Sequence, residues 1–290
     1  MTRLSFRPSL STLLVLLFST ACGAQTKDFT EKVSKEFTLT DAVGRSTLAV
    51  YNVQGSVAVQ GYAGATVVVE ATRTIRADDA KTLEAGKAEA KPGFLQRNDS
   101  VIVYMAGPFD SRPRHNYRGN WNERPIKYRY EVDYVIKVPY AMNLRVSTVN
   151  NGTLDVRDVT GLLDVSNVNG SIKLANVQGR TSAHTVNGNV DATYAAPPPG
   201  ASSYKTINGE ITVRYPASLA ADLHFKSMHG EFYTDFPNAE ILPTQVTKNR
   251  EGRGGGTVYT LSKATAVRLG KGGPDLRFET LNGNVTVTKQ

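Results

Sequence analysis

The segment Ser147–Tyr194 reads "STVNNGTLDVRDVTGLLDVSNVNGSIKLANVQGRTSAHTVNGNVDATY", and its internal spacing predicts the architecture of the chain. Asn-Gly occurs in it three times, and this pair is a strong short-range signal for a two-residue β-hairpin turn. The glycines, however, recur every nine residues, and such a fixed period indicates an internal structural repeat. The repeating glycines are Gly152, Gly161, Gly170, Gly179 and Gly188.

Each nine-residue unit follows one pattern of apolar and polar side chains. Counted from the glycine, the second and fourth positions are mostly apolar and the third is mostly polar, which is the alternation of a β-strand. A continuous strand would next bury position six, but valines stand at position seven. Since a shift of one residue turns every side chain to the other face, this break predicts a corner in each unit. The valines are Val159, Val168, Val177 and Val186.

A second period is visible in the residue before the glycine. Asparagine stands there in every second unit, at Asn151, Asn169 and Asn187. We therefore expect a parallel β-solenoid, or β-helix, with two nine-residue sides per coil and equivalent positions stacked about 4.8 Å apart. Stacked asparagines would form a hydrogen-bonded ladder, and the glycines would supply left-handed corners. An antiparallel β-sandwich or meander with Asn-Gly turns is the alternative.

The repeat continues toward the end of the chain with longer coils. Gly209 and Gly230 continue the pattern, each 21 residues after the preceding glycine, so we expect each to begin a longer coil. The pair Asn282-Gly283 repeats the motif close to the last residue. We thus expect an all-β, single-domain solenoid over residues 27–290, with about 18–21 residues per coil. The corner positions are Asn151, Gly152, Gly161, Asn169, Gly170, Gly179, Asn187, Gly188, Asn208, Gly209, Gly230, Asn282 and Gly283.

One region, at about residues 77–127, interrupts the repeat. Residues 78–91 are rich in Ala, Lys and Glu and stop at Pro92-Gly93, which predicts a short helix. Residues 109–127 hold several prolines, glycines and basic residues and the only tryptophan of the chain, which predicts a long exposed loop. A cleanly alternating strand is expected to follow over residues 128–138.

Residues 1–24 have the pattern of a secretory signal peptide. Arg3 and Arg7 precede the apolar run at residues 13–18, which is too short to cross a bilayer, and small residues follow it. The pattern therefore predicts an exported protein.

The only cysteine, Cys22, directly follows this signal. Its surroundings, "STAC", resemble a bacterial lipobox, in which the cysteine is lipidated and becomes the new N-terminus. Ser19 stands where a lipobox usually carries leucine, so ordinary cleavage after Ala21 or Ala24 is the alternative. We expect a bacterial protein of the periplasm, the outer membrane or the cell surface, held by a lipid anchor if Cys22 is modified.

The chain carries a net charge of +8. Arg3 and Arg7 leave with the signal, so the mature chain keeps 8 − 2 = +6. A basic surface attracts anionic polymers, and in an exported protein we expect an acidic glycan, lipopolysaccharide or an envelope protein rather than nucleic acid. Solubility alone is the other interpretation of this charge.

The order of the motifs resembles the bacterial putative-adhesin family of β-strand-repeat proteins, a domain of unknown function. The motifs are "YEVDYVIKVP", "LRVSTVNNGTLDV", "VNGSIKL", "VNGNVDA", "TINGEITV" and "GEFYTDFP". The resemblance covers about residues 45–290. It implies an exported β-solenoid with no established catalytic residues and no cofactor. The loop at residues 109–127 matches no motif of that family.

Two sets of side chains are candidates for chemistry. Asp155 and Asp191 share the outward third position two coils apart, with Lys173 between them, and Asp164 faces out from the other side. Carboxylates two coils apart, about 9.6 Å, could act as a glycosidase pair, but we favour a charge-compensated, solvated ladder as the explanation. The loop offers guanidinium forks and aromatic faces that suit carboxylates, phosphates or sugars. These are Arg112, Arg114, Tyr117, Arg118, Trp121 and Arg124.

Together these features predict a non-catalytic, adhesin-like binding or structural module of the cell envelope. No histidines and carboxylates stand at metal-ligand spacing, so neither a metal nor a cofactor is expected. A carbohydrate-active enzyme on a β-helix and an envelope scaffold that binds a partner are the alternatives.

Overall fold

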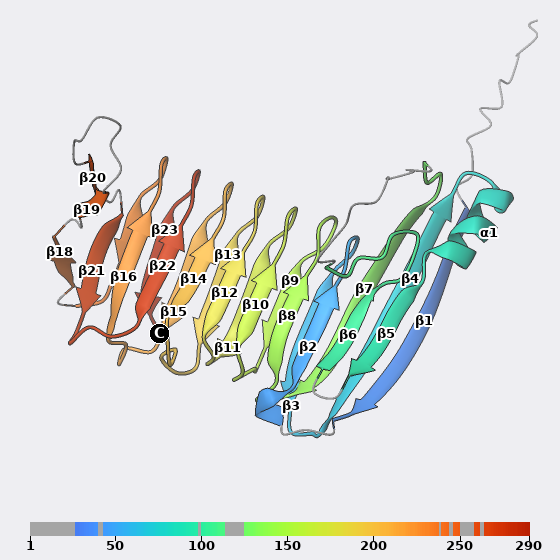
Figure 1. Cartoon of the computed structure of the whole chain (residues 1–290), viewed down its shortest axis with the longest axis horizontal. Helices are drawn as coiled ribbons and strands as arrows, with labels where there is room; N and C mark the ends of the chain where they lie inside the picture. Colours follow the sequence, from blue (N-terminus) through green and yellow to red (C-terminus); the bar gives the residue numbers. More distant parts are fainter. Residues whose placement is uncertain are drawn as a thin grey trace, which may run out of the picture.

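The computed structural model describes residues 27–39, 43–97, 100–113, 125–237, 239–243, 246–249, 258–261 and 264–290. Within them the chain is all-β, with one α-helix and the short 3₁₀-helix η1 (Val43–Arg45). Two large sheets face each other along the length of the molecule (Figure 1). The antiparallel pair β19 (Val246–Asn249) and β20 (Val258–Leu261) belongs to neither sheet. No helix in these ranges is long and apolar enough to cross a membrane.

Sheet A has ten strands among the described residues. In spatial order they are β1 (Lys27–Thr38), β4 (Thr66–Ala77), β7 (Arg129–Pro139), β3 (Val57–Tyr62), β9 (Leu154–Arg157), β11 (Ile172–Val177), β13 (Val190–Tyr194), β15 (Ile211–Tyr215), β23 (Val285–Lys289) and β17 (Phe232–Thr234). Neighbours are parallel from β7 to β17, whereas β1, β4 and β7 pair antiparallel.

Sheet B has eleven strands in the same part of the chain. Their order is β18 (Glu240–Leu242), β21 (Thr265–Leu269), β16 (Ala221–Lys226), β22 (Asp275–Glu279), β14 (Ser202–Lys205), β12 (Thr181–His184), β10 (Leu163–Ser166), β8 (Asn143–Ser147), β2 (Thr47–Tyr51), β6 (Ser100–Met105) and β5 (Pro92–Arg97). Neighbours are parallel from β16 to β6 and antiparallel outside that range.

The prediction of an all-β chain is confirmed, but both sheets are mixed rather than parallel throughout. From β8 to β15 the chain alternates between sheet B and sheet A. Partners in the centre of sheet A come from every second nine-residue unit, as in the pairing of Leu154 with Ile172 and of Ile172 with Val190. The antiparallel strands lie at the ends of the sheets and give them their mixed character.

The order of the last strands differs from the order of their glycines in the sequence. The C-terminal strands β22 and β23 each lie between strands that precede them in the sequence. β22 lies between β14 and β16 (Figure 1), and β23 lies between β15 and β17. Asn282 consequently bridges Asn208 on one side and His229 on the other. The expectation that Gly230 begins the coil after Gly209 was therefore wrong, because the Gly283 unit lies between them.

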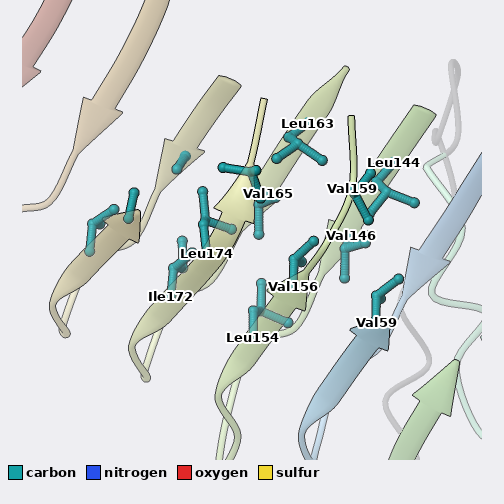
Figure 2. Packing of buried hydrophobic residues seen from close by; sticks show 14 of the residues in the cluster. Val59, Leu144, Val146, Leu154, Val156, Val159, Leu163, Val165, Ile172 and Leu174 are labelled. Carbon is teal, nitrogen blue, oxygen red and sulfur yellow. The ribbon is translucent and has the colours of Figure 1, made fainter. Parts of the chain in front are cut away.

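The core lies between the two sheets, where alternate residues of every central strand point inward. Figure 2 shows Leu154 and Val156 of sheet A opposite Leu144 and Val146 of sheet B, all of them buried. Burial of one such side chain stabilises the fold by about 1.5–3 kcal/mol. These contacts continue through one cluster from Leu48 to Val287, so the alternation of apolar residues is confirmed as the origin of the core.

The seventh-position valines have two different environments. Val159 and Val177 are fully buried, as expected. Val168, in contrast, is 36% exposed, and Val186 is only half-buried. The nine-residue units thus end in two kinds of corner. The seventh-position valine is buried at the corners of Val159 and Val177, but not at the Asn-Gly corners of Val168 and Val186.

The expected helix is confirmed as α1 (Ala80–Glu89). Asp79 caps its first turn by accepting a hydrogen bond from the backbone N–H of Thr82 at 2.8 Å, the usual role of aspartate at this position. The guanidinium of buried Arg73 donates to the carbonyl oxygens of Lys87 and Ala90 at the other end. Next in the chain, the β5–β6 hairpin extends sheet B, and residues 114–124 of the expected loop lie outside the described residues.

Candidate functional site

The asparagines before the glycines form the predicted ladder along one corner of the molecule. The rungs are, in stacking order, Asn169, Asn187, Asn208 and Asn282, and the Nδ2 group of each donates to the Oδ1 atom of the rung before it, at 2.7–2.8 Å. At one end Asn169 donates to Asn150 at 2.7 Å, and at the other His229 contacts Asn282 at 3.1 Å. The ladder therefore joins coils that are distant in sequence.

Asn151 does not belong to this ladder. It has the left-handed backbone conformation, with φ of 57°, and its side chain donates to Gln54 at 3.1 Å. Asn150 takes the expected place because this corner contains one additional residue before Gly152. The assignment of Asn151 as the first rung was therefore wrong by one residue.

Close approach between stacked backbones requires glycine at Gly170 and Gly179, where no left-handed corner is present. Gly283 combines such a close approach with a positive φ of 147°. A Cβ atom on Gly170 would lie 2.0 Å from the carbonyl oxygen of Gly152, and one on Gly179 would lie 1.7 Å from that of Gly161. Neither Gly170 nor Gly179 has a positive φ. The close contact explains the glycines at both kinds of corner. The expected conformational role was wrong for these two positions.

A row of buried polar side chains, which was not predicted from the sequence, lies under the asparagine ladder. Thr185 donates its hydroxyl to the carbonyl oxygen of Gly170 at 2.9 Å, and Thr206 donates to Gly188 at 2.8 Å. Buried Asn167 reaches Gly152 in the same way at 3.0 Å. The signal was present in the repeated pattern of Thr or Asn three residues before the glycine. Hydrogen bonds therefore join neighbouring coils at the Asn-Gly corners both on the exposed side, through the asparagine ladder, and on the buried side, through this row.

A groove with a volume of about 650 Å³ lies on the outer face of sheet B. Small side chains form its floor, namely Ser182, Ala201 and Ser203. Arg145, Arg180 and Arg277 line the same groove. The hollow arises because small outward residues of β12 and β14 lie between β22 and β8, which carry Arg277 and Arg145.

Register places the polar groups of the groove in one row across the strands. Arg145 lies opposite Asp164, which lies opposite Ser182 on the next strand. The row continues from Ser203 to Arg277. Because paired residues on neighbouring strands share a face, all these side chains point out from sheet B. The row runs across the strands, so the groove is elongated along the axis of the stack.

The arginines of the groove differ in their partners. Arg145 forms an ion pair with Asp164 at 3.1 Å, and its hydrogen bonds to Tyr51 and Asp164 raise the pKa of Arg145 above its ordinary value. Arg277 lies 3.4 Å from Asp275. Exposed Arg180 has no ion pair or side-chain hydrogen bond among the described residues. Arg180 is thus the guanidinium with donors available for a ligand.

A second hollow of about 380 Å³ adjoins the groove, since Arg145 lines both. Arg97 and Arg112 line it together with Asp110. The two hollows are lined by five arginines and three aspartates in total, which leaves a surplus of positive charge. Such a surface favours an anionic ligand.

Arg112 is the one residue of the predicted loop cluster that the structure describes. Its guanidinium bonds both carboxylate oxygens of Asp110 and stacks over the ring of Tyr104 at 4.3 Å from the centroid. The other predicted binding residues lie outside the described residues: Arg114, Tyr117, Arg118, Trp121 and Arg124. The groove arginines were missed because nothing in their local sequence distinguishes them from other outward polar residues.

The predicted carboxylate row has the expected register on sheet A. Asp155 lies opposite Lys173, and Lys173 lies opposite Asp191. Asp155, however, is bound by Arg157 at 2.7 Å, two residues along its own strand. The row faces away from the groove on sheet B, so the two candidate regions are on different sides of the molecule.

Neither the predicted lipid site nor a metal site is seen. Cys22 lies outside the described residues. Within the described ranges, no three His, Cys, Asp or Glu side chains gather as a metal site would require.

Comparisons with known proteins give only distant similarities. No family model and no curated protein matches the chain. Among solved structures, it is similar to a putative cell adhesion protein from Clostridium sporogenes, at 11% identity and a TM-score of 0.44, covering 90% of this chain and 100% of that one. A putative adhesin from Bacteroides fragilis has 9% identity and a TM-score of 0.32, with 90% and 97% covered. A putative lipid binding protein from Parabacteroides distasonis has 12% identity and a TM-score of 0.29, with 89% and 96% covered.

Proposed function

We propose that this protein is an exported, non-catalytic, adhesin-like module in which the central β-solenoid presents the sheet B groove to an acidic glycan. The supporting observation is the surplus of guanidinium groups around a floor of small residues. Guanidinium forks bind carboxylate, phosphate or sulfate groups through two parallel hydrogen bonds. An elongated groove that crosses several strands suits a polymer that carries such groups at intervals.

The charged groups inside the groove divide into two roles. Asp164 and Asp275 hold Arg145 and Arg277, which fixes the direction of these guanidinium groups. Arg180 has its donors free among the described residues and packs its chain near Gly200, where a Cβ would lie 3.5 Å from its Cδ. We assign primary ligand contact to Arg180 and supporting contact to Arg145 and Arg277. We assign the aspartates to positioning, and for this reason the proposed module has no proton-transfer step.

Retention on an immobilised polyuronate tests this proposal. The wild-type chain should be retained at low ionic strength, and Arg180→Ala combined with Arg145→Ala should elute early. Lys173→Ala is the matched control because Lys173 is an exposed cation on the opposite sheet. Equal retention of the double variant and the control would contradict the proposed site. Retention on a lipopolysaccharide column, compared in parallel, distinguishes phosphate from uronate as the anionic group.

The cellular part of the proposal rests on residues 1–24 alone. We propose that the segment directs export and that Cys22 carries the lipid that tethers the module to the envelope. Fractionation of cells that express the full chain tests this, with globomycin to block lipoprotein processing. Accumulation of an unprocessed form in globomycin supports lipidation. Normal processing of Cys22→Ser to a soluble exported form would instead indicate ordinary cleavage.

A further inference from the structure

The asparagine corner carries a surface that the groove does not use. The backbone N–H of each ladder residue bonds to a carbonyl oxygen on the adjacent coil. Asn187, for example, donates to Val168, the residue just before Asn169. These bonds stack one aliphatic residue from each coil into a single row, which we name the aliphatic ridge. Met228 completes the ridge because it precedes His229, which bridges Asn282. In stacking order the ridge is Val53, Val149, Val168, Val186, Ile207, Leu281 and Met228.

The ridge is most exposed at the end of the stack formed by Leu281 and Met228. Val53, Val149 and Val186 are half-buried. Val168 and Ile207 are 36% exposed, Leu281 is 38% exposed and Met228 is 67% exposed. Six steps of about 4.8 Å give the ridge a length of about 29 Å. It is a continuous apolar line beside the asparagine ladder.

The ladder beside the ridge has unused hydrogen-bonding groups. A side-chain amide has two N–H donors and two acceptor lone pairs. Asn187 uses one donor on Asn169 and one lone pair on Asn208. Asn208 repeats this arrangement between Asn187 and Asn282. Among the described residues, one N–H and one lone pair on each of these amides are thus available, and they recur at the strand spacing.

The charges around this corner argue against an anionic ligand. No residue of the ridge or of the asparagine rungs carries a charge. Glu210 and Glu231 follow the corner glycines on its sheet A side, and carboxylates repel an acidic polymer. On the sheet B side, Lys205 and Lys226 both pair with Glu279, at 3.5 and 2.7 Å. The corner therefore differs in charge from the groove.

The width of the ridge argues against a second copy of the chain. The ridge is one residue wide and has seven side chains, whereas a stable protein interface uses about 20–30 residues on each side. A narrow line of repeated, individually weak contacts suits an extended polymer. Once one unit of the polymer is bound, its neighbouring units are held close to the next contacts, and the overall affinity rises.

We propose that this corner is a second binding site and takes a neutral linear polysaccharide, laid lengthwise along the stack. The C–H faces of successive sugar rings pack on the aliphatic ridge, and their hydroxyl groups exchange hydrogen bonds with the free N–H groups and lone pairs of the ladder. The site is independent of the acidic-glycan groove, from which it differs in position, charge and ligand class.

The test measures binding of a water-soluble, linear neutral β-glucan to the full mature chain by affinity electrophoresis. The wild type should be retarded, and Ile207→Ser combined with Leu281→Ser should weaken binding at least tenfold. Ile241→Ser is the matched control, because Ile241 is 76% exposed and lies off the ridge. Arg145→Ala should bind the glucan like the wild type, which separates this site from the groove.

Thermal melting and size-exclusion chromatography with light scattering accompany each variant. If the double variant does not fold, Met228→Ser serves in its place, because Met228 is the most exposed residue of the ridge. Absence of glucan binding by the wild type would overturn the proposal, as would wild-type binding by a folded ridge variant. A wild-type dimer that the ridge substitutions dissociate would also overturn it and would assign the ridge to self-association.

Discussion

The carbonyl oxygen of Gly152 occupies the space that a side chain on Gly170 would need, since a Cβ atom there would lie 2.0 Å from it. Gly188 has the same relationship to Gly170, at 2.4 Å. The corner glycines are thus in direct contact with the backbone of the adjacent coil. Because the contacting atoms are backbone, a larger side chain at these positions would fit only if the two coils moved apart.

Gly170→Ala is therefore expected to lower the free energy of unfolding by at least about 3 kcal/mol, at the upper end of what overpacking costs. Gly44→Ala is the matched control, since no atom of the described residues lies within 4 Å of a Cβ at Gly44, and it should leave stability nearly unchanged. Urea unfolding followed by circular dichroism measures both. Similar midpoints for the two variants would refute the close-approach explanation.

Asn187→Ala should destabilise the fold modestly, because it removes two hydrogen bonds of the ladder. At about 1 kcal/mol for each bond, the free energy of unfolding should fall by about 2 kcal/mol at most. The loss is limited because the ladder is exposed and water replaces the missing partners. Lys173→Ala, which removes an exposed side chain of sheet A outside the ladder, should have no measurable effect in the same unfolding experiment.

The buried tyrosines provide a matched pair of substitutions. The hydroxyl of Tyr215 donates to Tyr204, Tyr204 donates to Tyr194, and Tyr194 donates to Thr181. Tyr204→Phe leaves a buried donor without an acceptor and should cost about 1–3 kcal/mol. Tyr134→Phe removes a buried hydroxyl that has no partner among the described residues, so it should be neutral or stabilising. Equal destabilisation by both variants would show that ring packing, not the hydroxyl chain, decides their effect.

The same tyrosines should make the fold sensitive to alkali. Burial raises the pKa of Tyr204 and Tyr215 well above the ordinary value, so the folded state keeps protons that the unfolded state releases above about pH 10. The contribution of these two protonated hydroxyls to the free energy of unfolding is therefore full below about pH 10. Above that pH the free energy of unfolding should fall by about 1.4 kcal/mol per pH unit for each group. Unfolding midpoints from pH 8 to 11 measure this, and a flat profile would contradict it.

Binding of an acidic glycan to the groove should weaken with added salt. The groove is open to solvent, and charges there are screened within about 10 Å at 0.1 M salt. We expect Arg180→Ala to reduce both the affinity at low salt and the slope of its salt dependence, measured by calorimetry at several NaCl concentrations. Salt-independent binding would assign the interaction to contacts other than these guanidinium groups.

Part of the structure was predictable because it follows from local periodicity. The nine-residue glycine spacing and the alternation at positions such as Leu154 and Val156 predicted which residues face the core. The two-unit period predicted the pairing of Asp155 with Lys173 and of Lys173 with Asp191. Helix α1 followed from its composition and from the Pro-Gly stop. Each of these features depends on residues close together in the chain.

Other features were not predictable, because they depend on which coils become neighbours. Nothing near Gly283 indicates that its coil inserts between those of Gly209 and Gly230. The groove likewise depends on small residues of β12 and β14 meeting arginines of β8 and β22. The sequence interpretation placed binding in the loop at residues 109–127. Of the binding residues predicted there, Arg112 is the one that lies in the described ranges, and Asp110 holds its guanidinium.

The all-β class, the alternation between two sides and the inward face of the central strands follow from residues close together in the chain. The reason for the glycines, the exposure of individual valines and the convergence of the guanidinium groups emerge only from the packed fold. Those properties arise from backbone and side-chain contacts between coils. Asn208 and Asn282, for example, form a hydrogen bond although 74 residues separate them in the sequence.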